Sequence, residues 1–130
     1  MATVLPFLMF QGRAEEAMRL YTVLFTDAAI AELERYGAGE TGPEGGVKRA
    51  RFTLGGQTVM CFDSPPVHAF TFTPSFSFLV ECASAEEQER LYSELARDGS
   101  EMMPLGEYGF SRRFGWVSDR FGVSWQLNLA

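Results

Sequence analysis

A twelve-residue motif that occurs twice constrains the fold of this chain more than any other feature of the sequence. Residues 14–25 and 85–96, which lie 71 positions apart, are identical at seven of twelve aligned positions. In the first copy, apolar residues recur at intervals of three and four, which predicts one buried stripe on a helix. This stripe consists of Ala14, Ala17, Met18, Tyr21, Leu24 and Phe25. The repeat therefore predicts two copies of one structural unit, each with an amphipathic helix.

The segments around the two helices also repeat. An apolar run precedes each helix, at 5–10 and at 76–82, and a longer stretch rich in β-forming residues follows it. The segment 28–36 has mixed propensities, and its place in the repeat predicts a strand. Each copy reads as a strand, a helix and three strands. The expected fold class is α+β, with two βαβββ modules in tandem, related by a pseudo-twofold axis, whose mixed sheets pair around a central cleft.

Several local signals mark the ends of elements. Gly55 and Gly56 separate two strand-like runs and predict a tight hairpin, and a second hairpin turn is expected at 119–122. Ser84 and Glu87 have the spacing of a capping box, which places the start of the second helix. The first helix has no comparable signal, because Gly12 is its best N-cap candidate.

Two segments read as connections. Residues 37–46 contain five glycines and one proline, which predicts a mobile or tightly turned loop with too few apolar groups to be packed. Residues 64–74 contain three prolines and the only histidine, His68, and read as a linker. The first module is expected at about 1–66 and the second at about 73–130.

Charge and composition exclude some classes of partner. The net charge of −6 and the isoelectric point near 4.8 disfavour nucleic acid and anionic membranes, because the sequence has no basic stripe to offset repulsion. No apolar run reaches the roughly 18 residues of a membrane span, and the first residues lack the positive charge of a signal peptide. A cytoplasmic location is expected, with Cys61 and Cys82 as buried thiols rather than a disulfide.

Taken together, seven short motifs resemble one protein family over nearly the whole chain. The sequence is similar to the vicinal oxygen chelate superfamily, which includes glyoxalase I, ring-cleaving dioxygenases and bleomycin resistance proteins. Within it, the resemblance is to the PhnB-like branch often labelled 3-demethylubiquinone-9 3-methyltransferase. The motifs that carry this resemblance occupy residues 6–10, 14–18, 36–40, 42–45, 56–57, 103–108 and 114–126.

This resemblance implies a single glyoxalase-like domain over residues 1–130, commonly found as a homodimer. Metal-dependent members use four His, Gln or Glu ligands from the first and fourth strands of the modules. Carried over, those positions fall at or beside Leu5, Met60, Phe76 and Gln126. Three of these four residues are apolar, and one-residue shifts bring in no histidine or carboxylate, so we expect neither a bound metal nor another cofactor.

The resemblance further implies a largely aromatic cleft with a single amide. Its expected ligand-binding residues are Phe7, Met9, Met60, Phe62, Phe76, Phe78, Trp116, Trp125 and Gln126. Of the neighbours Trp125 and Gln126, only one can face inward, because successive residues of a strand point to opposite faces.

A metal-free protein that binds a small apolar or aromatic molecule is the leading hypothesis, with no catalytic residues. The alternatives are an enzyme of the superfamily, including the methyltransferase of the family label, and a structural or interaction module whose cleft is filled by its own side chains. The Gly-rich loop and strand-to-helix context that S-adenosylmethionine binding ordinarily needs are absent, since Gly55 and Gly56 sit in a hairpin.

Overall fold

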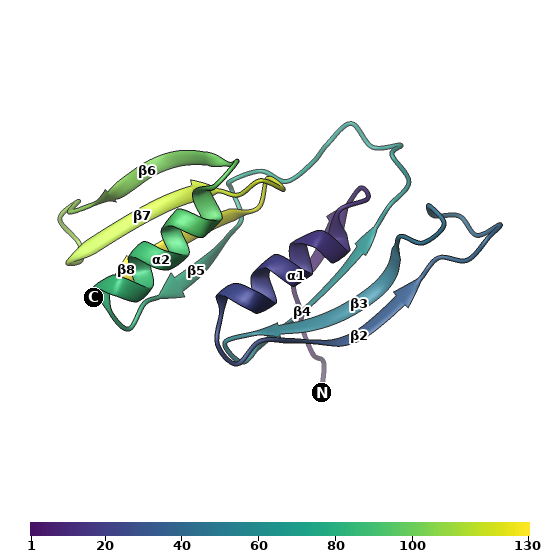
Figure 1. The fold of residues 1–130 in the computed structure, drawn as a ribbon, viewed down its shortest axis with the longest axis horizontal. Helices are drawn as coiled ribbons and strands as arrows, with labels where there is room; N and C mark the ends of the chain where they lie inside the picture. Colours follow the sequence, from purple (N-terminus) through teal and green to yellow (C-terminus); the bar gives the residue numbers. More distant parts are fainter. The chain divides into compact units, whose positions relative to one another are not determined.

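The computed structural model describes all residues, 1–130, and divides them into two compact units, Met1–Ala69 and Phe70–Ala130. Each unit contains one helix and one four-stranded sheet, and the chain passes from the first to the second within the proline-rich segment at 64–74 (Figure 1). The protein therefore has the α+β composition that the sequence predicted.

The first unit has the order of elements expected from the repeat. Its elements are β1 (Phe7–Phe10), α1 (Ala14–Leu24), β2 (Ala29–Arg35), β3 (Val47–Leu54) and β4 (Gln57–Asp63). In this sheet, called sheet A, the strands lie in the order β1-β4-β3-β2. The pair β1 and β4 is parallel and the other two pairs are antiparallel, which makes the sheet mixed.

The second unit repeats this topology. Its elements are β5 (Ser77–Glu81), α2 (Ala85–Ala96), β6 (Ser100–Gly106), β7 (Arg113–Ser118) and β8 (Ser124–Leu129). Sheet B has the order β5-β8-β7-β6, again with one parallel pair, β5 and β8. The tandem βαβββ architecture is thereby confirmed. Pairing with β7 extends strand β6 through Pro104 to Gly106.

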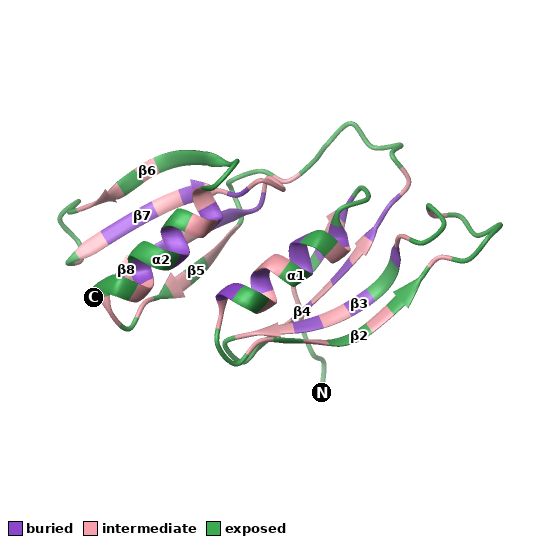
Figure 2. Cartoon of the chain, in the orientation of Figure 1, coloured by how far each residue is buried: buried purple, intermediate pink, exposed green.

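Each helix buries one face against its own sheet, as the purple stripe on α1 and α2 shows (Figure 2). Tyr21 of α1 is fully buried, with its ring centroid 6.3 Å from that of Phe52. Its counterpart Tyr92 is buried on α2, and its hydroxyl lies 3.5 Å from the carbonyl oxygen of Met103. The two tyrosines thus occupy corresponding positions in the repeat. Neither helix is long and apolar enough to cross a membrane.

The sequence signals for the first hairpin and for the second helix are confirmed. Gly55 and Gly56 have φ angles of 52° and 88°, which a tight two-residue turn of this kind requires. At the start of α2, the backbone N–H of Glu87 donates to the Ser84 hydroxyl at 3.1 Å. In return, the Glu87 carboxylate accepts from the backbone N–H of Ala83 at 2.8 Å, so the capping box is complete.

The start of α1 is capped by a residue far away in the sequence. Oδ1 of Asp63, the last residue of β4, accepts hydrogen bonds from the backbone N–H groups of Gly12 at 2.8 Å and Ala14 at 3.0 Å. Its Oδ2 accepts from the N–H of Val47 at 2.9 Å. A buried carboxylate therefore fills the role for which the local sequence offered only Gly12, and it lies where the helix dipole favours negative charge.

The glycine-rich segment at 37–46 is more closely tied to the sheet than the sequence predicted. The backbone N–H of Tyr36 donates to Gly46, and the N–H of Gly45 donates back to Tyr36, which closes the loop at its base. The Tyr36 hydroxyl donates to the carbonyl oxygen of Asp63 at 2.9 Å. The segment is thus tightly turned and mostly exposed, as expected, and hydrogen bonds rather than apolar contacts close it.

Candidate functional site

Each sheet has one face that packs under its helix and one face that does not, and the latter is called here its open face. On β4, Val59, Cys61 and Asp63 are buried. The intervening Met60 and Phe62 point to the opposite side, because successive side chains of a strand alternate. This alternation assigns Met60 and Phe62 to the open face of sheet A.

Four of the predicted ligand-binding residues come together on the open face of sheet A. Phe7 is the cross-strand partner of Met60, and Met9 is the partner of Phe62. The rings of Phe7 and Phe62 lie 5.1 Å apart, and 62% of Phe7 is exposed. Arg51 of β3 follows Met60 in the same cross-strand row, with its guanidinium 3.8 Å from the Glu32 carboxylate. This face is apolar toward β1 and charged toward β2.

On the open face of sheet B, Gln126 lies between two apolar side chains. Trp125, Leu127 and Leu129 of β8 are buried on the side of α2, so Gln126 points the other way. Its cross-strand partners are Leu79 on β5 and Trp116 on β7. Trp116 is half-buried and 61% of Leu79 is exposed. The structure thus brings the predicted residues Gln126 and Trp116 together.

The predicted cleft residue Trp125 lies in the core of the second unit, and the half-buried Phe78 packs beside it on the same face, which corrects their placement. Trp125 is 1% exposed, and its indole N–H donates to Asp119 at 2.9 Å. Phe78 is the cross-strand partner of Trp125, with ring centroids 4.9 Å apart. Phe76 precedes β5, is 55% exposed and packs edge-on against Phe78. The register of β8 therefore presents Gln126, and not Trp125, to the open face.

Two serines of this face were not among the predicted site residues. The indole N–H of Trp116 donates to the Ser124 hydroxyl at 2.8 Å, and the hydroxyls of Ser124 and Ser77 lie 2.6 Å apart. The amide nitrogen of Gln126 donates to Ser77 at 3.3 Å. Serine and phenylalanine alternate at 75–78, and this alternation is the sequence signal that places Ser77 on the face opposite to Phe78.

Comparison with known proteins identifies the family of the chain. A model of the family described as 3-demethylubiquinone-9 3-methyltransferase matches residues 2–128. The chain belongs to this family.

Two similar proteins match the chain nearly end to end. One is a solved structure described as a putative 3-demethylubiquinone-9 3-methyltransferase, PhnB protein, from Bacillus cereus. It is 50% identical, with a TM-score of 0.96, and the match covers 99% of this chain and 100% of that one. The other is protein YjdN of Escherichia coli strain K12, which is 26% identical over 95% of this chain and 92% of its own length.

A more distant structure shows the same fold. The glyoxylase/bleomycin resistance protein/dioxygenase domain from Frankia sp. EAN1pec is 19% identical, with a TM-score of 0.67. The match covers 100% of this chain and 98% of that chain. This chain therefore shares the fold of that domain.

The residues at the four implied metal positions do not fit a transition metal. Met60 and Gln126 lie on the open faces of different sheets, while Leu5 and Phe76 precede β1 and β5. Their side chains offer one thioether and one amide, a poor donor set for zinc, manganese or iron. Among the residues described, 1–130, no group of three or more His, Cys, Asp or Glu side chains could hold a metal ion.

The two cysteines of this family member are not activated nucleophiles. Burial raises the pKa of the Cys61 thiol to about 12, and the nearby Asp63 charge adds to the effect. Burial also raises the pKa of Cys82 to about 11, although this residue is only half-buried rather than buried as predicted. The thiolate is the nucleophilic form of cysteine, and thiols with such pKa values stay protonated at neutral pH.

His68, the only histidine of the chain, is exposed in the segment between β4 and β5.

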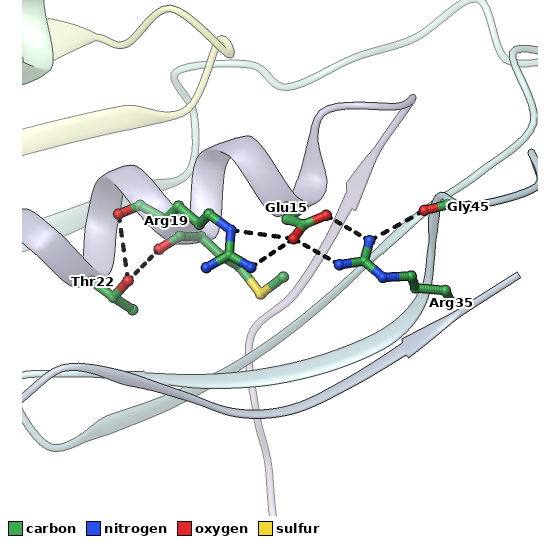
Figure 3. Close-up of polar contacts among 6 residues, drawn as sticks. Glu15, Arg19, Thr22, Arg35 and Gly45 are labelled. Atoms are coloured by element: carbon green, nitrogen blue, oxygen red, sulfur yellow. Dashed lines mark hydrogen bonds and ion pairs between the residues drawn. The ribbon is translucent and has the colours of Figure 1, made fainter.

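The carboxylate of Glu15, on the first turn of α1, is held between two arginines (Figure 3). Arg35 donates to its two oxygens at 2.6 and 2.8 Å, and Arg19 donates to Oε2 at 2.7 Å. The hydrogen bonds from Arg35, and then those from Arg19, lower the pKa of Glu15 to about 2. Both arginines are about half exposed, so this cluster is a surface ion-pair network and not a catalytic acid.

Replacing Glu15 by glutamine is expected to lower the free energy of unfolding at pH 7 by up to about 1 kcal/mol at low salt. Because the folded pKa lies below the ordinary value of 4.5, this contribution is complete above about pH 4.5 and is lost as the pH falls toward 2. Urea unfolding between pH 7 and pH 2.5 measures it. Glu86→Gln, at the corresponding position of α2, is the control. Equal losses in both variants at every pH would contradict the assignment.

Proposed function

We propose that this protein is a metal-free small-molecule-binding member of its superfamily, and that its ligand lies on the open face of sheet B. The observation that carries this proposal is the row formed by Leu79, Gln126 and Trp116, which combines exposed apolar surface with one amide. Ligand sites commonly have this composition, with a few polar groups that orient the ligand among apolar side chains.

The fold and the donor chemistry support binding rather than methyl transfer or metal-dependent catalysis. Each sheet has four strands and a single helix, whereas a doubly wound domain places a Gly-rich strand-to-helix turn against the cofactor. The turn between β1 and α1 contains one glycine, Gly12, whose N–H is already bonded to Asp63. We therefore do not propose a methyltransferase activity for this chain on the basis of the family name.

Binding is testable with the neutral fluorescent probe N-phenyl-1-naphthylamine. Trp116→Ala is expected to weaken probe binding about tenfold, because a large half-buried aromatic side chain contributes much of the contact area. Fluorescence titration measures the dissociation constant. Phe110→Ala, which removes an exposed aromatic ring outside this row, is the matched control. Equal effects in both variants would show that the probe does not use this face.

Metal independence is tested with the same probe. Because the implied ligand positions offer no suitable donors, treatment with a chelator is expected to leave the probe dissociation constant unchanged. Elemental analysis of protein purified without added metal supplies the second measurement. One equivalent of zinc, nickel, manganese or iron per chain would overturn this part of the proposal.

We also propose that the chain forms a homodimer, as the family resemblance implies. The exposed apolar side chain of Phe7, on the outer strand β1, supports self-association. Sedimentation equilibrium at micromolar concentration is expected to give twice the chain mass of 14.5 kDa. A mass near 14.5 kDa at that concentration would remove the proposal.

A further inference from the structure

The hydrogen bonds on the open face of sheet B point to the class of ligand. We propose that this face recognises a neutral molecule that carries a carboxamide-type group, with a carbonyl beside an N–H, attached to a flat apolar body. This inference rests on the proposed binding function and adds the chemistry of the ligand to it.

The polar groups of this face form one continuous chain across three strands. The Trp116 indole N–H donates to Ser124, whose hydroxyl lies 2.6 Å from that of Ser77, and Gln126 donates to Ser77 from its amide nitrogen. Ser124 is only 1% exposed, although it lies on the face opposite α2. The Trp116 side chain thus extends along the sheet toward the serines and is held there by its hydrogen bond.

Some donors and one acceptor of these hydrogen-bonded groups have no partner within the group. The indole N–H, the two hydroxyls and the amide NH₂ hold five protons in all, and three of them are used within the chain. Because Ser124 is 1% exposed and Ser77 is its neighbouring acceptor, the Ser124 hydroxyl donates to Ser77, so that the Ser77 hydroxyl proton and one amide proton of Gln126 remain. The amide oxygen of Gln126 accepts no hydrogen bond from the protein. The unused donors and the acceptor are therefore carried by neighbouring groups.

A carboxamide is complementary to these two donors and this acceptor. Its carbonyl oxygen can accept from the free amide proton and the hydroxyl, while its N–H donates to the Gln126 oxygen. A carboxylate offers only acceptors, and an ammonium offers only donors, so either one would leave part of the arrangement unpaired. Unpaired polar groups weaken binding, since each loses its hydrogen bonds to water.

The charge of the surrounding rows also favours a neutral ligand. Next to the row of Leu79, Gln126, Trp116 and Met103 lies a row of serines, with residues 77, 124, 118 and 100 as successive cross-strand partners. Neither row contains an ionisable side chain, and the row on the other side contains one, the exposed Glu81, whose carboxylate accepts from the Asn128 amide at 3.2 Å. An anionic ligand would therefore be partly desolvated with no opposite charge to compensate, and a cationic one would find only this exposed carboxylate.

The corresponding row of sheet A provides an internal contrast. In place of Gln126 and Trp116 it has Met60 and Arg51, with Phe7 and Glu32 at its ends. Met60 can neither donate a hydrogen bond nor accept a strong one. Amide recognition is accordingly expected on the second unit alone.

The test compares three probes of nearly equal size on ¹⁵N-labelled protein: 2-naphthamide, N,N-dimethyl-2-naphthamide and 2-naphthoate. We expect 2-naphthamide to bind about tenfold more tightly than the other two, because only it can satisfy both the donors and the acceptor. The indole N–H signal of Trp116 is expected to shift on titration. The indole signal of Trp125, which is buried and bonded to Asp119, serves as the internal control and is expected to stay in place.

Gln126→Leu is expected to remove the preference for 2-naphthamide over its dimethyl analogue, since leucine has similar volume and no polar group. Thermal unfolding checks that this variant is folded. Gln126→Glu is a second variant of the same shape that accepts hydrogen bonds but cannot donate them, and it is expected to weaken 2-naphthamide binding about tenfold.

The outcomes separate this inference from the proposed function. Equal affinity of the wild-type protein for 2-naphthamide and its dimethyl analogue, with the Trp116 signal still shifting, would overturn amide recognition and leave the binding face intact. Persistence of the preference in both Gln126 variants would also overturn it. If none of the three probes shifts the Trp116 signal, both the proposed function and this inference are overturned.

Discussion

Replacement of Asp63 by alanine is expected to lower the free energy of unfolding by about 3 to 5 kcal/mol, since it leaves three backbone N–H groups without their acceptor. These N–H groups belong to Gly12, Ala14 and Val47, and they join the start of α1 and the start of β3 to the end of β4. The carboxylate is 1% exposed, so water cannot fully replace it.

Asp63→Asn gives a finer test of the same geometry. The asparagine side chain has only one acceptor oxygen, so its NH₂ group faces a backbone N–H that the second carboxylate oxygen would accept. We expect this variant to lose about 2 kcal/mol of unfolding free energy. Asp98→Asn, at an exposed position with a φ of 58° that asparagine tolerates, is the matched control and is expected to be near neutral. Urea unfolding measures all three variants. A loss below 1 kcal/mol in Asp63→Ala would contradict the capping role.

Gly99→Ala is expected to cost about 2 to 4 kcal/mol, because a methyl group there meets backbone atoms that cannot turn aside. A Cβ at this position would lie 2.2 Å from the carbonyl oxygen of Ser118 and 2.9 Å from the carbonyl carbon of Asp119. Gly99 connects α2 to β6, so relief of the clash requires that the chain move away from the end of β7.

Gly106→Ala, at the other end of β6, is the control for this substitution. Its Cβ would find its nearest neighbours at 3.7 Å, which is ordinary contact, and a change within about 1 kcal/mol is expected. Thermal unfolding of both variants compares them directly. Equal stabilities would mean that the backbone near Ser118 adjusts at little cost and that close packing is not the reason for glycine at this position.

The sequence by itself determined the features that depend on neighbours along the chain. The repeated motif located both helices, because the spacing of apolar residues on a helix is a local property. The Gly55-Gly56 turn located β3 and β4 at the observed bounds, and Ser84 with Glu87 located the start of α2. The order of elements then followed from the duplication, and the seven motifs indicated the family.

Only the tertiary structure decided the features that depend on contacts between distant segments. Asp63 caps α1 from 49 positions away, and no local pattern identifies such an acceptor. A shift of one residue in the pairing of β8 would exchange the faces of Trp125 and Gln126. The observed pairing places Trp125 in the core and Gln126 on the open face. The pairing of Ser77 with Ser124 likewise joins strands 47 positions apart. Alternation along a strand can be read from sequence, but the face that meets the helix is chosen by packing energy summed over the whole unit.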